Sequence, residues 1–262
     1  MKYGVVFPQT EIGSDPGAVR EYAQAAEELG YENIIVFDHV LGANAESRPG
    51  WSGAYRHTDS FHEPFVLYGF LAGITESIGL TTAVIILPQR QTVLAAKQAA
   101  AIDVLSNGRL RLGIGTGWNA VEYEALGENF QDRGRRSEEQ IALMRELWTN
   151  ELVTFNGRWH TVTDAGINPL PVQRPIPVWF GGKADQVVKR VAETGDGWFP
   201  LFPPNDEGRE LIDRMREMAT AAGRDPADIG IESFIGHRGR SPDEWVADVK
   251  TWTDMGATHL SV

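Results

Sequence analysis

Cysteine is absent from this chain of 262 residues. The chain therefore has no disulfide, no thiolate metal ligand and no cysteine nucleophile. Long apolar runs are also missing, since none reaches the roughly 18 residues that a membrane-spanning helix needs. Met1-Lys2 leads directly into a strand-like run at residues 3–7, which does not resemble a signal peptide. We therefore expect a cytoplasmic protein without a membrane anchor.

Basic residues are scarce, with 24 Lys and Arg against 36 Asp and Glu, a formal net charge of −12. Such a surface disfavours binding to nucleic acid or to anionic membranes. Residues 89–136 depart from this trend, with 7 basic and 5 acidic residues. We expect an anionic ligand to be tolerated best near this segment, although each arginine there could equally belong to a solvated helix face.

Two common catalytic patterns are also lacking. The sequence has no His-Glu-x-x-His motif, and His57, His62, His160 and His237 show no helical spacing to carboxylates that would suggest a metal site. A Gly-x-Ser-x-Gly nucleophile elbow is absent as well. Metal catalysis and serine-type nucleophilic catalysis therefore have little support, and we expect no metal.

Short apolar runs alternate with segments of helical periodicity along the whole chain. A helix is expected to begin at Asp15-Pro16, and two capping boxes start with Ser137 and Ser241. This alternation predicts a (β/α)8 TIM barrel formed by a single domain of residues 1–262, with a doubly wound sheet as the alternative. The helix expected after the eighth strand is missing from the sequence. The expected strands cover residues 3–7, 33–37, 79–87, 110–115, 178–180, 197–199, 230–234 and 259–262.

Two insertions interrupt the alternation. Residues 40–63, after the second strand, form a long irregular loop rich in glycine and aromatic residues, and loops of this kind are usually functional. Residues 150–176, before the fifth strand, contain the hairpin signal Asn156-Gly157 and prolines at 169, 171 and 175, with a further proline at 177.

In such a barrel the active site lies at the carboxyl ends of the strands. Asp38-His39 follows the second strand and pairs an acid with an imidazole, which can exchange a proton near neutral pH. The same pair could also simply cap loop backbone. The end of the seventh strand near Glu232 is expected to face the same mouth.

The fourth strand opens into a glycine-rich turn at residues 113–119, read as Gly-Ile-Gly-Thr-Gly-Trp-Asn. Glycines allow backbone N–H groups to approach a phosphate closely, so this turn is a candidate phosphate cradle. A tight turn without a ligand is the alternative. Gly181-Gly182 follows the fifth strand, and glycines and aromatic residues around one mouth suit a large planar cofactor with an anionic tail.

A series of motifs runs in order along nearly the whole chain. They are GVVFPQ (4–9), AAEELGY (25–31), VFDH (36–39), LPQR (87–90), AKQA (96–99), DVLSNGRL (103–110), GIGTGWN (113–119), RGRR (133–136), PVWFGG (177–182) and GDGW (195–198). On these motifs the chain resembles the luciferase-like monooxygenase superfamily of flavin and deazaflavin oxidoreductases. Within it, the motifs most resemble those of the branch that uses coenzyme F420.

The resemblance implies that the third strand bulges, often through a non-prolyl cis peptide, against the back of the cofactor ring, here near Ala83–Val84. It implies that Asp38 and His39 lie beside the reactive ring, and that Trp51, Tyr55 and His57 in the covering loop contact substrate. F420 enzymes of this branch often have a glutamate where Trp118 stands, so that acid is missing here. The implied cofactor-binding residues are Thr82, Ala83, Val84, Gly115, Thr116, Gly117, Trp118, Asn119, Gly181 and Gly182.

The hypothesis from sequence is an F420-dependent oxidoreductase that transfers a hydride to or from a small organic substrate, with His39 assisting proton movement. An FMN-dependent monooxygenase that uses reduced flavin and O2 is the first alternative. A barrel that binds flavin or another anion without catalysis is the second. The apolar helices would also suit a homodimer.

Overall fold

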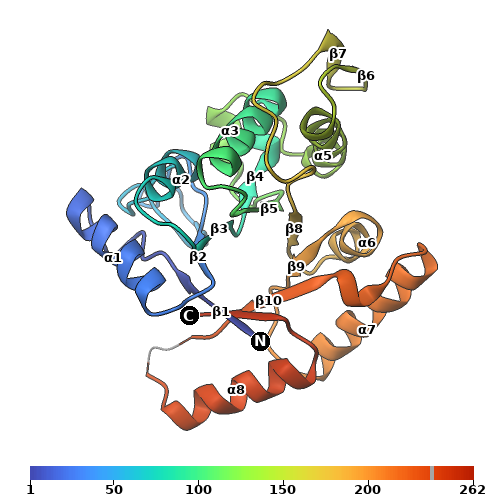
Figure 1. Cartoon of the computed structure of the whole chain (residues 1–262). Helices are drawn as coiled ribbons and strands as arrows, with labels where there is room; N and C mark the ends of the chain where they lie inside the picture. Colours follow the sequence, from blue (N-terminus) through green and yellow to red (C-terminus); the bar gives the residue numbers. More distant parts are fainter. Residues whose placement is uncertain (237–238) are drawn as a thin grey trace.

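The computed structural model describes residues 1–236 and 239–262, so the candidate His237 lies outside the described residues. Its parallel strands form a closed ring with helices around the outside (Figure 1). In the described chain the strand order is β3-β2-β1-β11-β10-β9-β8-β5, and β5 pairs again with β3, which closes the ring. This confirms the (β/α)8 barrel and rules out the doubly wound sheet. The strands are β1 (Lys2–Val6), β2 (Asn33–Val36), β3 (Gly79–Thr82), β4 (Ile85–Ile86), β5 (Leu110–Gly115), β8 (Val178–Gly181), β9 (Gly197–Phe199), β10 (Gly230–Phe234) and β11 (His259–Ser261).

Five of the eight described α-helices begin at a residue whose side chain caps the helix, whereas those at Thr92–Leu105, Arg133–Thr149 and Asp185–Thr194 have no side-chain cap. Asp15 accepts a hydrogen bond from the Gly17 N–H at 2.9 Å, and Ser241 and Glu244 form the expected capping box. The box predicted at Ser137 is wrong, because the helix begins one turn earlier and the Ser137 hydroxyl donates to the Gly134 carbonyl inside it. The helices are α1 (Pro16–Glu28), α2 (Pro64–Ala72), α3 (Thr92–Leu105), α4 (Ala120–Ala125), α5 (Arg133–Thr149), α6 (Asp185–Thr194), α7 (Asp206–Ala221) and α8 (Pro242–Asp254), with short 3-10 turns at Leu87–Gln89 and Pro226–Asp228.

The second insertion forms the antiparallel hairpin β6 (Val153–Asn156) and β7 (Thr161–Ala165), which projects away from the barrel (Figure 1). The Asn156-Gly157 turn is confirmed by a hydrogen bond from the Gly157 N–H to the His160 carbonyl at 2.8 Å. The His160 ring bridges Glu139 at 2.8 Å and the Thr92 hydroxyl at 2.6 Å. This histidine therefore anchors the hairpin to α5 and α3.

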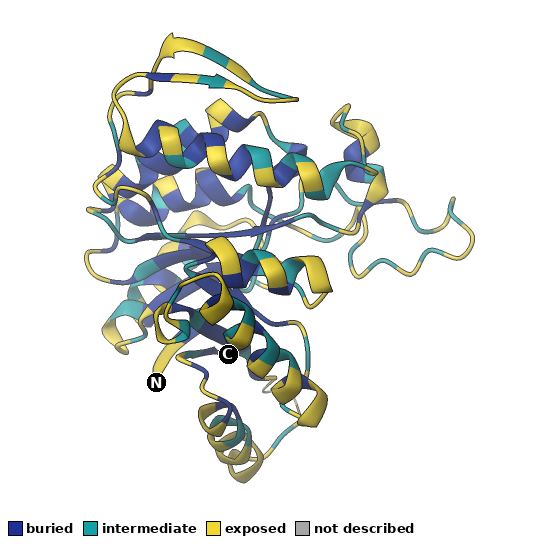
Figure 2. Cartoon of the chain, turned by 90° about the vertical axis from the view of Figure 1, so that its right-hand side faces the viewer, coloured by how far each residue is buried: buried dark blue, intermediate teal, exposed yellow. Residues whose placement is uncertain are grey.

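Most of the core lies between the barrel and its helices, whose inner faces are buried (Figure 2). The barrel interior, in contrast, holds an ion pair between Arg111 of β5 and Glu232 of β10. Two strands separate β5 from β10 in the sheet, so the contact crosses the interior. The guanidinium carbon of Arg111 also lies 4.2 Å from the Trp179 ring centroid, and Asn33 and Ser261 donate to Glu232.

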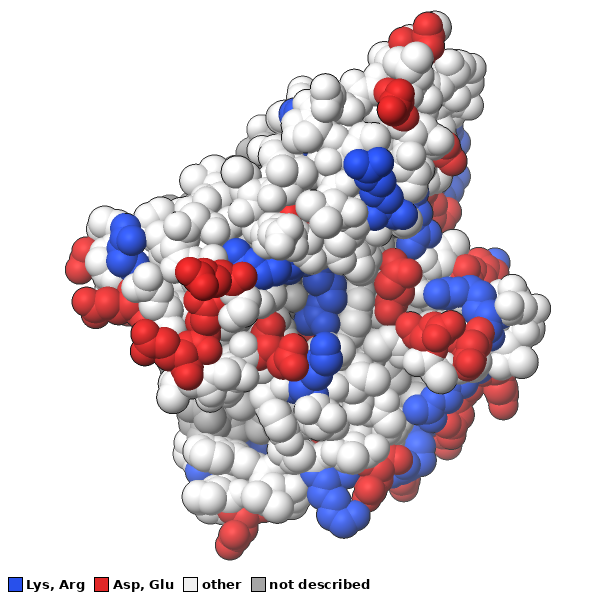
Figure 3. Space-filling model, viewed as in Figure 1, with Lys and Arg blue, Asp and Glu red and all other residues white. Residues whose placement is uncertain are grey.

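These contacts correct the expectation that Glu232 faces the mouth, because it lies midway along its strand and is fully buried. On the face of the molecule seen in Figure 3, acidic and basic side chains are interspersed. Among the described helices, none has the length and apolar character needed to cross a bilayer.

Candidate active site

The third strand bulges at the mouth of the barrel. β3 ends at Thr82, a cis peptide joins Ala83 to Val84, and the strand resumes as β4. The Thr82 hydroxyl donates to the Gly113 carbonyl at 2.8 Å, which ties the start of the bulge to β5. Both parts of the interrupted strand pair with β5. The cis peptide implied by the resemblance is therefore present, at the implied position.

Two glycines make room for the bulge. A Cβ atom on Gly115 would lie 2.4 Å from Val84 Cγ2, and one on Gly181 would lie 2.7 Å from Val84 Cγ1. Carbon atoms in contact are normally about 3.5–4.0 Å apart, so any side chain at either position would collide with Val84. The lack of a side chain at these two glycines therefore leaves room for the two methyl groups of Val84 at the mouth of the barrel.

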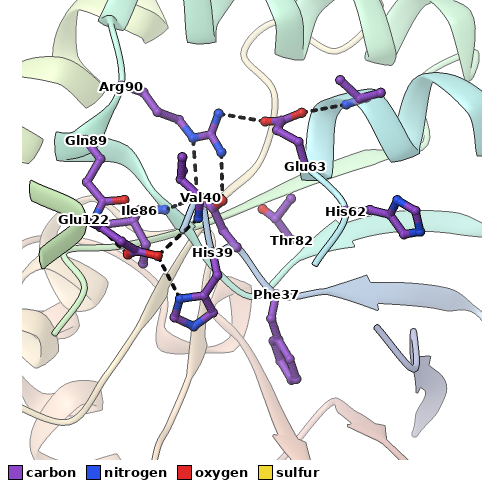
Figure 4. Close-up of polar contacts among 12 residues, drawn as sticks. Phe37, His39, Val40, His62, Glu63, Thr82, Ile86, Gln89, Arg90 and Glu122 are labelled. Carbon is purple, nitrogen blue, oxygen red and sulfur yellow. Dashed lines mark hydrogen bonds and ion pairs between the residues drawn. The ribbon is translucent and has the colours of Figure 1, made fainter. Parts of the chain in front are cut away.

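The Asp38 carboxylate, just after β2, also supports the bulge through contacts with Ile86 and Arg90, which are both labelled in Figure 4. Its Oδ2 accepts a hydrogen bond from the Ile86 N–H at 2.9 Å, and its Oδ1 pairs with Arg90 at 2.8 Å. Arg90 in turn pairs with Glu63, the N-cap of α2, at 2.7 Å. Burial raises the pKa of Asp38, although Arg90 opposes this effect. Asp38 thus faces Arg90 rather than its neighbour His39.

His39 pairs instead with Glu122, a residue of the unpredicted helix α4. Its Nδ1 lies 3.0 Å from Glu122 Oε1, and the two side chains are 11% and 1% exposed. Gln89 donates to the other carboxylate oxygen at 3.1 Å. Burial alone would raise the pKa of Glu122, but hydrogen bonds from His39 and Gln89 outweigh it and keep that pKa below its usual value. Glu122 is therefore ionised at neutral pH.

Aromatic rings enclose the imidazole. The ring centroids of Tyr55 and Phe61 lie 4.6 and 4.8 Å from that of His39, both edge-on, and the Trp118 ring lies at 5.8 Å. Trp51 packs on the far side of Trp118, with 5.9 Å between the centroids. The loop at 40–63 thus folds over His39, as a covering loop should.

A cavity of about 460 Å³ lies over the bulge, within the size range of ligand sites. Thr82, Trp51 and His57 are not part of its lining. Thr82 is buried behind the bulge, and His57 lines a neighbouring cleft that also reaches His39 and Tyr55. The predicted residues that line the cavity are Asp38, His39, Tyr55, Ala83, Val84, Gly115, Thr116, Gly117, Trp118, Asn119, Gly181 and Gly182.

The positive charge at the cavity comes from a residue outside the basic segment. Of the described side chains in the lining, only that of Lys183 is cationic. It precedes α6, a ten-residue helix whose N-terminus has no side-chain cap. Most arginines of residues 89–136 have other partners: Arg109, for example, donates to backbone carbonyls of residues 75, 78 and 106. The expectation that this segment would favour an anion is thus not supported by their contacts.

Sequence reasoning missed Glu122, Gln89 and Lys183. The position of Glu122 could have been found from Asn119, which is the N-cap of α4. The Asn119 side chain accepts a hydrogen bond from the Val121 N–H at 3.1 Å. An Asn-x-x-Glu pattern after a strand is a helix start. Asn119, which the resemblance predicts to be a cofactor contact, therefore has a structural role as the cap of α4.

The protein is thus a (β/α)8 barrel with a cavity at its mouth. The bulge of the third strand forms the floor of this cavity, and the buried pair of His39 and Glu122 lies beside it. The chain belongs to the luciferase-like monooxygenase family, whose family model matches residues 1–257. Members of this family are oxidoreductases and monooxygenases.

Two relatives carry different cofactors in their names. The chain is 32% identical over 238 residues to an F420-dependent glucose-6-phosphate dehydrogenase of Intrasporangium calvum, covering 80% of this chain and 67% of that protein. It is 30% identical over 220 residues to an FMNH2-dependent dimethylsulfone monooxygenase of Pseudomonas putida, covering 82% and 57%. Among solved structures, an F420-dependent secondary alcohol dehydrogenase in complex with an F420–acetone adduct superposes with a TM-score of 0.79 at 17% identity, covering 99% of this chain and 92% of that one.

Proposed function

We propose that the protein is an F420-dependent oxidoreductase that transfers a hydride between the deazaflavin and a small organic substrate. The observation that carries this proposal is the imidazole of His39 at the edge of a cavity that remains open to water. Trp118 and Leu201, which line the cavity, are 45% and 60% exposed. A hydride carrier that reacts poorly with O2 tolerates such openness, whereas an oxygenated flavin needs water excluded.

The residues of the cavity fit a planar ring with an anionic tail. Val84, backed by Gly115 and Gly181, offers an apolar floor for the ring. Lys183 and the uncapped N-terminus of α6 offer a cation and backbone N–H groups for a phosphate. Gly182, with φ at +124°, allows the chain to turn between these two parts.

When bound, the deazaflavin supplies the hydride-accepting or hydride-donating carbon. His39 moves the accompanying proton, because its Nε2 makes no hydrogen bond to the described residues while Nδ1 is held by Glu122. Asp38 acts as a positioning residue that fixes the bulge through the Ile86 N–H. Tyr55, on the covering loop, packs against the imidazole and borders the space left for the substrate.

An FMN-dependent monooxygenase is the second candidate, because the Pseudomonas putida relative uses FMNH2 and both cofactors share a ribityl phosphate. Titration of the purified protein with F420 and with FMN, followed through quenching of tryptophan fluorescence, separates the candidates. We expect tight binding of F420 and weak binding of FMN. The reverse result would favour the monooxygenase, and binding of neither would refute both.

The variant His39→Ala tests catalysis against simple binding. If His39 moves the proton, this variant keeps most of its affinity for F420 and loses most of its F420 reduction with a panel of small alcohols. Because Nε2 is the free nitrogen, proton transfer by general acid–base catalysis is the step that disappears, typically a loss of about 10²–10⁴-fold. Unchanged turnover would remove His39 from the mechanism, whereas a wild-type protein that binds F420 but turns over no substrate of the panel would support a barrel that binds without catalysis.

A further inference from the structure

We propose that Glu122 is a positioning residue that fixes the tautomer of His39, with the proton on Nδ1 and the basic lone pair on Nε2. The consequence for catalysis rests on the proposed function, since it assumes that His39 moves a proton. The tautomer itself is a property of the protein alone and can be measured without cofactor or substrate.

The contacts around Glu122 assign the proton. Its Oε1 lies 3.0 Å from His39 Nδ1 and accepts a second hydrogen bond from the Val40 N–H at 3.2 Å. Its Oε2 accepts from Gln89 Nε2 at 3.1 Å. An ionised carboxylate can only accept hydrogen bonds, so Nδ1 must be the donor. In a neutral imidazole, a proton on Nδ1 leaves Nε2 as the acceptor.

The surroundings also fix the orientation of the ring. Turning the imidazole over would place a carbon atom against Glu122 and leave a buried carboxylate without one of its donors, which is energetically unfavourable. Tyr55 and Phe61 both pack edge-on against the ring, and their own centroids lie 4.7 Å apart, so the three rings form one cluster. The close packing of both aromatic rings further restricts rotation of the imidazole.

No other acid among the described residues takes this place. Asp38 precedes His39 in sequence, but its carboxylate is engaged by Arg90 and by the Ile86 N–H. Glu122 reaches His39 because α4 begins at the mouth, directly after β5 and the Asn119 cap. A histidine on one strand end is therefore oriented by a helix that follows a different strand.

Nitrogen-15 correlation spectra of the histidine side chains in the full-length protein test the assignment. The His39 signals are identified by their absence from the spectrum of His39→Asn. At a pH where the imidazole is neutral, we expect the wild-type protein to show a protonated Nδ1 and an unprotonated Nε2. A wild-type spectrum with the proton on Nε2 would overturn the proposal without touching the proposed function.

Three variants define the role of the carboxylate. Glu122→Met has no acceptor, so His39 should lose its preference for the Nδ1–H form. Glu122→Gln keeps an acceptor oxygen and should retain the Nδ1–H form in part. If the methionine variant does not fold, this glutamine variant still tests the proposal. Glu124→Met on the exposed side of the same helix is the matched control and should leave the spectrum unchanged. An unchanged His39 signal in Glu122→Met contradicts the proposal.

If the proposed function also holds, Glu122→Met lowers kcat for F420 reduction by about 10–100-fold, the size of loss found when a metal-bound histidine loses the partner that orients it. KM should stay close to the wild-type value, because the Glu122 carboxylate is 1% exposed and is already engaged by His39, Val40 and Gln89. Glu124→Met should turn over at the wild-type rate. A loss confined to KM would mean that Glu122 shapes the binding cavity instead.

Discussion

Gly115→Ala should destabilise the protein by pressing on the bulge of the third strand. The new methyl group would lie 2.4 Å from Val84 Cγ2, more than 1 Å inside normal contact distance. Relief of the overlap requires Val84 to move away from residue 115, and the space open to it is the cavity that it lines. Such a shift disturbs the backbone of the bulge or forces the side chain from its preferred rotamer.

Overpacking of this kind costs about 1–3 kcal/mol, so we expect a loss of about 2 kcal/mol in the free energy of unfolding. For a chain of this size, that corresponds to a fall in Tm of roughly 4–8 °C. Affinity for the cofactor should also fall, because relief of the clash pushes Val84 into the cavity.

Urea denaturation of a double-mutant cycle measures the effect. Val84→Ala alone removes two half-buried methyl groups and should cost about 1–2 kcal/mol. In the double variant the alanine at 115 occupies the vacated space, so the combined cost should be smaller than the sum by at least about 1 kcal/mol. Gly69→Ala is the control, since Gly69 lies in α2 with nothing within 4 Å of its Cβ position.

The reasoning would be refuted by an additive cycle, because additivity means that residues 84 and 115 do not compete for space. A Gly115→Ala variant as stable as the wild type would lead to the same conclusion. Equal destabilisation by Gly69→Ala would show that backbone freedom, rather than contact with Val84, explains the loss.

Three further predictions concern other parts of the molecule. Asp38→Asn should cost about 3 kcal/mol in urea denaturation, the lower end for breaking a buried pair, because Glu63 still neutralises Arg90; a neutral result would contradict the support assigned to Asp38. Burial, and to a smaller extent Arg111, lowers the pKa of His259 from 6.5 to about 3. As the pH drops below 6.5, this histidine becomes protonated in the unfolded chain but not in the folded protein, so the free energy of unfolding should fall. Between pH 6.5 and about 5 this residue adds a slope approaching 1.4 kcal/mol per pH unit that His259→Gln should remove, and equal slopes in both proteins would contradict the shift. We also propose that two copies of the chain associate through the apolar outer faces of α2 and α3, since Val66 and Leu94 are 72% and 51% exposed. Leu94→Glu should then be a monomer in sedimentation equilibrium, and a mass equal to that of the wild-type protein would refute this interface.

The barrel itself was predictable from local sequence. Each strand is a short apolar run and each helix has its own periodic face, so neighbouring residues carry enough information to identify them. Asp15 and Ser241 act as caps for the same reason, because a cap depends on residues within one turn. The family motifs added the position of the bulge at Ala83–Val84, which composition and periodicity could not have located.

The partners of the site residues were decided by the tertiary structure. Asp38 and His39 are adjacent in sequence, yet they face different partners, Arg90 and Glu122, which are 52 and 83 residues away. Glu232 likewise lies inside the barrel, where it pairs with Arg111, and not at the mouth as expected. Closing a sheet into a ring brings residues from distant strands together, and side-chain periodicity within one strand carries no information about what lies across that ring.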